Sequence, residues 1–154
     1  MIALVFKAFE LHRRPVPISP SGRAWFVLDG VCFPDENWFD FPLSILGSAF
    51  GAYLELMQGA NEAVTYLFDG PFDLNYRRSA SVSEVSVKIT SYSEGDEFEK
   101  ILKAETEVSM AELRNALMAS ANLMAVALSS AEGSDGANSR VVAQILKELE
   151  KDSL

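Results

Sequence analysis

Basic residues are missing from the whole stretch between residues 24 and 76, which holds eight acidic residues but no Lys or Arg. The acids are Asp29, Asp35, Glu36, Asp40, Glu55, Glu62, Asp69 and Asp73. The full chain carries a formal charge of −9 at pH 7. A field of one sign attracts a basic partner and repels nucleic acid. Arg77 and Arg78 are too few for a nucleic-acid footprint, so we expect no DNA or RNA binding.

Cysteine and histidine are nearly absent, with one of each, Cys32 and His12. A single cysteine cannot form an internal disulfide, so a reducing cytoplasm is the expected setting. Two such residues are too few for a Cys/His metal cluster, and the acids lack the spacing of a calcium loop. We expect no metal and no other cofactor.

Catalytic signatures are missing as well. His12 stands in a loop beside two arginines, and Cys32 stands in an apolar strand with acidic neighbours, where a buried thiol is the expected state. No Gly-x-Ser-x-Gly, Gly-x-Gly-x-x-Gly or P-loop motif is present. The sequence names no catalytic residue and favours a non-enzymatic protein, although it leaves the question open.

Long hydrophobic runs are also lacking, since no 18 consecutive apolar residues occur. We therefore expect no membrane span. The start of the chain lacks the basic region that precedes the apolar run of a secretory signal, so we expect no such signal either. The length of 154 residues fits one domain, residues 1–154. Two loops are expected inside it: a proline-rich loop at 12–23 and a Gly/Ser loop at 132–138.

The first half of the chain alternates between strand and helix signals. Strands are predicted at 2–11, 24–28 and 31–33, with Asp29-Gly30 as a two-residue hairpin turn. Asp40 is expected to cap the following helix, which has Pro42 in its first turn and Gly59 at its end. That helix carries a strip of small residues: Ser44, Gly47, Ser48 and Gly51. We expect the strip to lie close against a sheet; a helix–helix seam is the alternative.

The second half predicts three further strands at 64–68, 72–76 and 84–90, followed by the segment 97–108. Alternation in 97–108 favours a strand, although Phe98, Ile101 and Leu102 also fit one helical turn. Ser109 and Glu112 have capping-box spacing before a helix at 110–131, and a last helix is predicted at 138–151. The expected fold is α+β: one curved antiparallel sheet of about six to seven strands with three helices, two of them C-terminal.

One segment mixes acids with aromatic residues, from Phe33 to Phe41. An exposed aromatic side chain ringed by charge is typical of a protein–protein interface, and Trp38 and Phe39 are the two candidates for it. In the simpler interpretation, the aromatic residues anchor the helix entry in the core while the acids face water. If the segment is a surface, the candidate partner-binding residues are Asp35, Glu36, Trp38, Asp40, Asp69 and Asp73.

Several short motifs between residues 25 and 76 resemble those of small acidic bacterial proteins. The motifs are Leu28-Asp29-Gly30, Phe33-Pro34, Trp38-Phe39-Asp40-Phe41 and Phe68-Asp69-Gly70-Pro71-Phe72. Many such proteins are uncharacterised, and some are regarded as immunity proteins of polymorphic toxin systems. The resemblance covers about a third of the chain and rests on turns and caps. It implies a non-enzymatic protein that binds and blocks a toxin domain, often a basic one.

The leading hypothesis is therefore an acidic, cytoplasmic, non-enzymatic binding protein, immunity-like, that occludes a basic protein partner. A second hypothesis is a small-ligand-binding or hydrolase-like domain with a pocket between sheet and helices, lined by Tyr66, Phe68 and Tyr76. A third is a homodimer built through the alanine-rich helix at 110–131.

Overall fold

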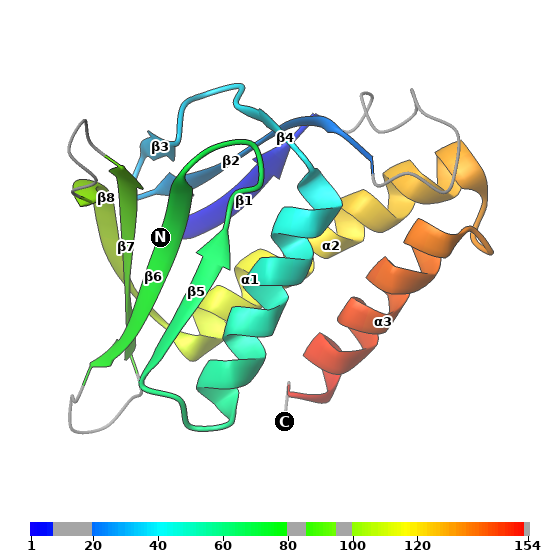
Figure 1. Ribbon diagram of the computed structural model, residues 1–154. Coiled ribbons are helices and arrows are strands. Elements are labelled where there is room, and N and C mark those ends of the chain that lie inside the picture. The colour runs from blue at the N-terminus through cyan, green and yellow to red at the C-terminus, as the bar shows by residue number, and fades with distance from the viewer. Residues whose placement is uncertain (8–19, 80–85, 95–99, 153–154) are drawn as a thin grey trace.

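The computed structural model describes residues 1–7, 20–79, 86–94 and 100–152 (Figure 1). In chain order the elements are β1 (Ile2–Phe6), β2 (Gly22–Leu28), β3 (Val31–Phe33), β4 (Phe39–Asp40), α1 (Pro42–Met57), β5 (Glu62–Tyr66), β6 (Phe72–Ser79), β7 (Ser86–Glu94), β8 (Lys100–Ser109), α2 (Met110–Glu132) and α3 (Ala137–Lys151). The predicted α+β class, with two of three helices at the C-terminal end, is confirmed. The predictions for His12, for most of the proline-rich loop and for residues 97–99 lie outside the described residues.

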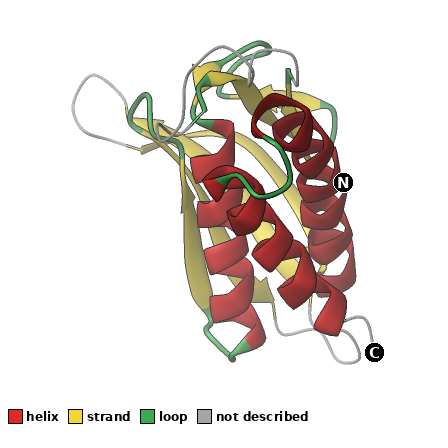
Figure 2. Cartoon of the chain, turned by 90° about the vertical axis from the view of Figure 1, so that its right-hand side faces the viewer, coloured by secondary structure: helices red, strands yellow, loops and turns green. Residues whose placement is uncertain are grey.

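The strands form two antiparallel sheets, where one curved sheet was expected. The first sheet has the order β1-β2-β3, with β4 also paired to β2, and the second has the order β5-β6-β7-β8. Helix α1 lies between the two sheets along the chain: it follows β4, the last strand of the first sheet, and precedes β5, the first strand of the second. The sheets meet where β8 passes β2 and β3. Figure 2 shows the three helices gathered on one side of the strands.

The predicted hairpin turn between β2 and β3 is confirmed. Asp29 and Gly30 both have positive φ angles, 47° and 86°. A two-residue turn with this backbone matches the right-handed twist of the strands it joins. The strand prediction for 97–108 is confirmed in its described part, since Ala104, Thr106 and Val108 are buried while the glutamates between them are exposed.

Each sheet has an outer strand that runs beside a helix, α1 along β5 and α2 along β1. The backbone N–H of Tyr66 points away from β6 and donates to the Ser48 hydroxyl on α1 (2.9 Å). The carbonyl of Leu4 accepts from the Ser120 hydroxyl on α2 (2.6 Å). Unpaired strand edges are templates for aggregation, so covering them with helices protects the chain.

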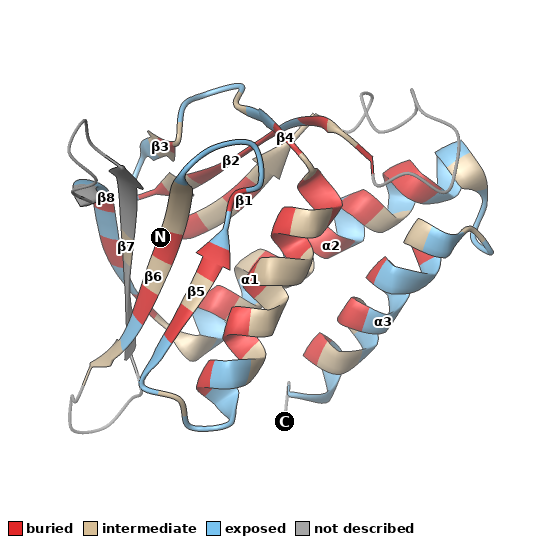
Figure 3. Cartoon of the chain, in the orientation of Figure 1, coloured by how far each residue is buried: buried red, intermediate tan, exposed pale blue. Residues whose placement is uncertain are grey.

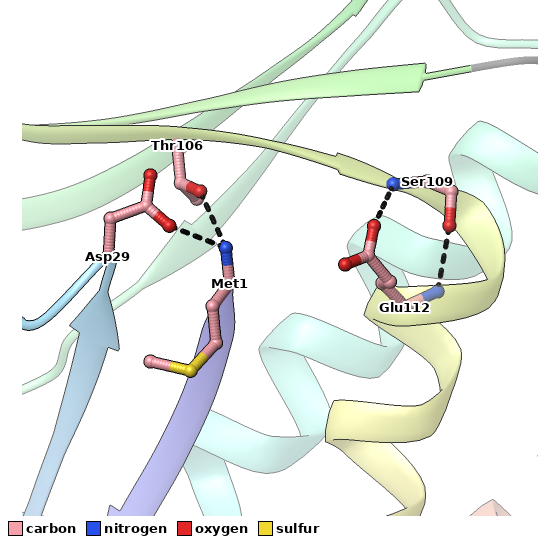
Figure 4. Close-up of polar contacts among 5 residues, drawn as sticks. All are labelled: Met1, Asp29, Thr106, Ser109 and Glu112. Carbon is pink, nitrogen blue, oxygen red and sulfur yellow. Dashed lines mark hydrogen bonds and ion pairs between the residues drawn. The ribbon is translucent and has the colours of Figure 1, made fainter.

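The start of α2 is fixed by the predicted capping box (Figure 4). The Ser109 hydroxyl accepts from the Glu112 backbone N–H, and the Glu112 carboxylate accepts from the Ser109 backbone N–H. Nearby, the Met1 amino group donates to Asp29 (2.5 Å) and to the Thr106 hydroxyl (3.0 Å), which joins the first sheet to β8. Hydrogen bonds from the Met1 amino group and from Thr106 hold the pKa of Asp29 below its ordinary value.

Arginines stabilise the C-terminal ends of two helices. Arg78, on β6, donates to the carbonyls of Leu56 and Ala60 at the end of α1. Arg114, on α2, donates through Nε to the carbonyl of Leu149 at the end of α3 (2.8 Å). The last carbonyls of a helix lack hydrogen-bond donors within the helix and carry partial negative charge. A guanidinium at this end supplies the donors and a compensating positive charge.

The core lies between the sheets and the helices, and buried and exposed positions alternate along each helix (Figure 3). The strip of small residues on α1 meets a sheet at Ser48, whose hydroxyl accepts from the Tyr66 backbone on β5. At Gly47 and Gly51 the expected close approach is wrong, because a Cβ atom added at either would meet nothing within 4 Å. Burial instead follows the opposite side of α1, where Ile45, Leu46 and Ala49 face the core. Among the described residues, no helix is both long and apolar enough to span a membrane.

Candidate functional site

Asp40 is fully buried and connects two loops that are far apart in the sequence. One loop, residues 34–38, joins β3 to β4, and the other, residues 67–71, joins β5 to β6. The Asp40 carboxylate accepts hydrogen bonds from four N–H groups: Trp38 Nε1 (3.0 Å), Phe41 N (2.7 Å), Phe68 N (3.1 Å) and Asp69 N (3.2 Å). Charge-assisted bonds of this kind are about twice as strong as neutral ones. The carboxylate therefore holds both loops against the start of α1.

This position corrects two predictions for Asp40. Its expected role as a surface acid is wrong, because none of its surface is exposed. It is also not the N-cap of α1; that position is Phe41, which makes no side-chain cap. Pro42 has no backbone N–H and requires no acceptor in the first turn, so the carboxylate can accept from the Phe41 backbone and from the second loop together.

Aromatic rings pack the two loops together below the surface. The rings of Trp38 and Phe72 meet edge to face with centroids 5.0 Å apart, and Phe33 meets Phe72 at 5.8 Å. Gly70 lies above them, where an added Cβ would come within 2.9 Å of the Phe72 ring and 3.2 Å of Trp38. Its φ of 157° and this crowding both favour glycine. Trp38 is thus half-buried and fixed, so it is not the free anchor that the sequence suggested.

Two phenylalanines are exposed on these same segments. Phe39 and Phe68 have 50% and 51% of their surface accessible. Their exposure has the same cause in both segments. Asp40 and Leu67 are buried, and successive residues of an extended segment point to opposite sides, so Phe39 and Phe68 point outward. Phe39 was one of the two aromatic residues predicted from the sequence as an interface anchor, whereas Phe68 was not.

Three of the predicted acids lie on the same two loops. Asp35 and Glu36 are exposed on the first loop, and Asp69 is exposed on the second. We call these three acids, together with Phe39 and Phe68, the acidic–aromatic surface. The backbone N–H groups of residues 68 and 69 donate to the Asp40 carboxylate, which brings the second loop next to the first.

The borders of this surface are set by two other residues. Asp73, the sixth candidate, lies half-buried on β6 opposite Tyr66 and accepts from the Asn75 side chain (2.7 Å), so it belongs to the sheet. Arg23 is exposed on β2 opposite Phe39 and brings one cation to the other border.

The residues expected to line a ligand pocket do not share one. Tyr76 is buried, and its hydroxyl hydrogen bonds to the Thr65 hydroxyl (2.8 Å). Burial raises the pKa of Tyr76 to about 12. Tyr66 and Phe68 are instead about half exposed. The prediction of a cavity lined by all three residues is therefore wrong. Strand residues alternate between the core and the surface, and Tyr76 lies on the core side while Tyr66 and Phe68 lie on the surface side.

Metal ligands do not gather in the part of the chain that the structure describes. Within it, no three His, Cys, Asp or Glu side chains are grouped so that they could hold an ion. Cys32 is half-buried and free of any disulfide.

Comparison with known proteins gives no family assignment for this chain. No protein-family model, no curated protein and no solved structure matches it. The site must therefore be interpreted from its own geometry, in which three exposed acids and two exposed phenylalanines lie on two segments joined by the buried Asp40.

Proposed function

We propose that the chain is a non-enzymatic binding protein that occludes a basic protein partner through the acidic–aromatic surface. The observation that carries the proposal is the exposure of Phe39 and Phe68 next to three acids, on loops held by one buried carboxylate. Aromatic side chains dominate the energy of most protein interfaces, and a charged rim sets the association rate. An immunity-like role, blocking a basic toxin domain, is the form of this function that the sequence resemblance implies.

Rigidity supports binding at this surface. Loops that order only on binding lose conformational entropy at that moment, which weakens the complex. Here the two loops are already fixed by four hydrogen bonds to Asp40 and by the packing of Trp38 on Phe72. The exposed phenylalanines can therefore be buried by a partner without reordering of the backbone beneath them.

The test begins with capture of partners from a lysate of the native source at about 0.1 M and about 0.5 M NaCl, because salt screens exposed charges. A basic protein retained at low salt and lost at high salt is the expected result. Its kinetics are then measured with Asp35→Lys/Glu36→Lys. The matched control is Glu55→Lys/Asp135→Lys, which changes the net charge equally at exposed sites elsewhere.

The proposal gives each variant a different kinetic effect. Reversal of Asp35 and Glu36 should slow association about tenfold at low salt, while the control changes it little. Phe39→Ala and Phe68→Ala should instead accelerate dissociation, by roughly 30-fold for a residue at the centre of the interface. Equal effects of the two charge-reversal variants, or unchanged dissociation of both alanine variants, would refute this surface as the binding site.

A further inference from the structure

Helix α2 has a second apolar side that faces solvent. Leu123 and Val126 are 64% and 69% exposed, the highest values among the large apolar side chains of the described residues. Ala119 is exposed beside them, and Ala116 is half-buried. The core-facing residues of this helix, Leu113, Leu117, Ala121, Met124 and Leu128, lie on its other side. An unpartnered apolar side of this kind is typical of an interaction site.

The spacing of these residues is that of a helix–helix seam. Ala116, Ala119, Leu123 and Val126 follow one another at steps of three, four and three residues. Alternating steps of three and four keep side chains along one line of a helix that packs on another helix. We call these four residues the outer stripe of α2. Its members are turned by roughly 80 to 160° from Met124 about the helix axis, at 100° per residue.

Charge indicates the chemistry of the partner. Residues 115–131 contain no charged side chain, in a chain with net charge −9. A basic partner would find no acid here, and an acidic partner would find no base. An apolar, uncharged helix side fits such a stripe, because its seam spacing suits helix–helix packing. The outer stripe of a second copy meets this description and is present at the same concentration.

The stripe is complementary to itself in antiparallel orientation. A two-fold axis at the level of residue 121 places Leu123 of one copy opposite Ala119 of the other, and Val126 opposite Ala116. Each large side chain then meets an alanine, which lets the two helices approach closely and fills the seam evenly. Beyond them, Glu112 faces Ser130, so no like charges meet. A parallel pair would instead set Glu112 against Glu112 and leave a gap between facing alanines.

We propose that this protein forms a two-fold symmetric dimer in which the outer stripes of two α2 helices pack antiparallel. The stripe from residue 116 to residue 126 is only about 15 Å long at 1.5 Å per residue. Such a contact falls at the small end of specific interfaces, below about 1,200 Å². The dimer is therefore weak, with a dissociation constant of roughly tens of micromolar, and each copy leaves the acidic–aromatic surface on other elements free.

The first test is analytical ultracentrifugation of the pure chain from about 5 to about 500 µM, which brackets that dissociation constant. The expected mass rises with concentration from 16.9 kDa to twice that value. Association should strengthen with salt, because two chains of net charge −9 repel each other. This is opposite to the salt dependence of basic-partner binding, so failure of one proposal leaves the other standing. A mass that stays at 16.9 kDa over the range, or one that exceeds two chains, would overturn the dimer.

A charge placed in the stripe supplies the second test. Leu123→Glu should abolish the rise in mass, whereas Val141→Glu should leave it unchanged. Val141 is an exposed apolar residue on α3 (48%), so the control adds the same charge outside the stripe. Circular dichroism of both variants checks that each one folds. Equal behaviour of the two variants would refute the role of the stripe.

Disulfide trapping tests the orientation. In a Cys32→Ser background, protein carrying Ala119→Cys is mixed with protein carrying Leu123→Cys under mild oxidation. Antiparallel packing should give mainly the mixed 119–123 disulfide, since those positions face each other across the seam. Predominant 119–119 and 123–123 disulfides would overturn the antiparallel arrangement.

Discussion

Replacing Asp40 by asparagine tests whether one buried carboxylate holds the two loops together. The substitution keeps the size of the side chain but removes its charge and turns one acceptor oxygen into a donor NH₂ group. In the protein, Oδ1 accepts from Phe41 N and Phe68 N, while Oδ2 accepts from Trp38 Nε1, Phe68 N and Asp69 N. The better orientation of the asparagine keeps the oxygen at the Oδ2 position.

The size of the effect follows from those contacts. In the better orientation, the NH₂ group faces the Phe41 backbone N–H, and a buried donor without a partner costs about 1–3 kcal/mol. The three remaining bonds lose their charge assistance, at up to about 1 kcal/mol each. A neutral asparagine costs less free energy to bury than a charged carboxylate, and this difference offsets part of the destabilisation. We expect Asp40→Asn to lower the free energy of unfolding by about 2–4 kcal/mol, a large share of a typical 5–15 kcal/mol.

Urea unfolding followed by tryptophan fluorescence measures this change. Asp35→Asn is the matched control: the chemical change is the same at an exposed position of the first loop, and the expected effect is within about 0.5 kcal/mol. Trp38→Phe removes one of the four donors and should fall between the two, by about 1 kcal/mol. An Asp40→Asn protein that unfolds within about 0.5 kcal/mol of the original would refute the role of the carboxylate.

Three further predictions follow from other parts of the fold. Gly47→Ala and Gly51→Ala should each stabilise the protein by up to about 1 kcal/mol in urea unfolding, because α1 gains helix propensity and nothing lies within 4 Å of the added methyl groups; destabilisation would contradict this open space. Arg114→Met should destabilise it by about 1 kcal/mol in the same assay, since the end of α3 loses its hydrogen bond and favourable charge, and no loss would show that water replaces the guanidinium. Tyr53 and Tyr76, whose pKa values burial raises to about 12, should ionise later than in the urea-unfolded chain when followed by ultraviolet absorbance. The stability that they contribute is present below pH 10 and is lost between pH 10 and about 12, and coincident titrations of the folded and unfolded chain would contradict both shifts.

Features that depend on a few neighbouring residues could be predicted from the sequence. The Asp29-Gly30 turn follows from residues that readily take positive φ, and the Ser109–Glu112 capping box from two side chains three positions apart. The same reasoning favoured a strand at 97–108 while leaving one helical turn as the alternative, and residues 100–109 form β8. Each of these features depends only on residues that are close together in the sequence.

The candidate site could be predicted only in part. The acidic segment marked Asp35, Glu36 and Asp69 correctly as exposed, because charged residues in turns seldom find partners in a core. The aromatic part was assigned to Trp38 or Phe39; Phe39 is exposed, whereas Trp38 is half-buried and the exposed Phe68 was not predicted as part of the surface. Choosing among adjacent aromatic residues requires knowing which of them meets another ring, and Trp38 meets Phe72 from a different hairpin.

The sequence by itself determined the α+β class, the helices, the hairpin turns and the concentration of negative charge, since all of these follow from local pattern and composition. Only the tertiary structure decided that Asp40 is a buried link between loops, that the strands divide into two sheets, and that Gly47 and Gly51 lie open. The reason is physical. Asp40 is buried because Phe68 and Asp69, 28 and 29 positions away along the chain, bring backbone donors to it, and no local pattern encodes that encounter.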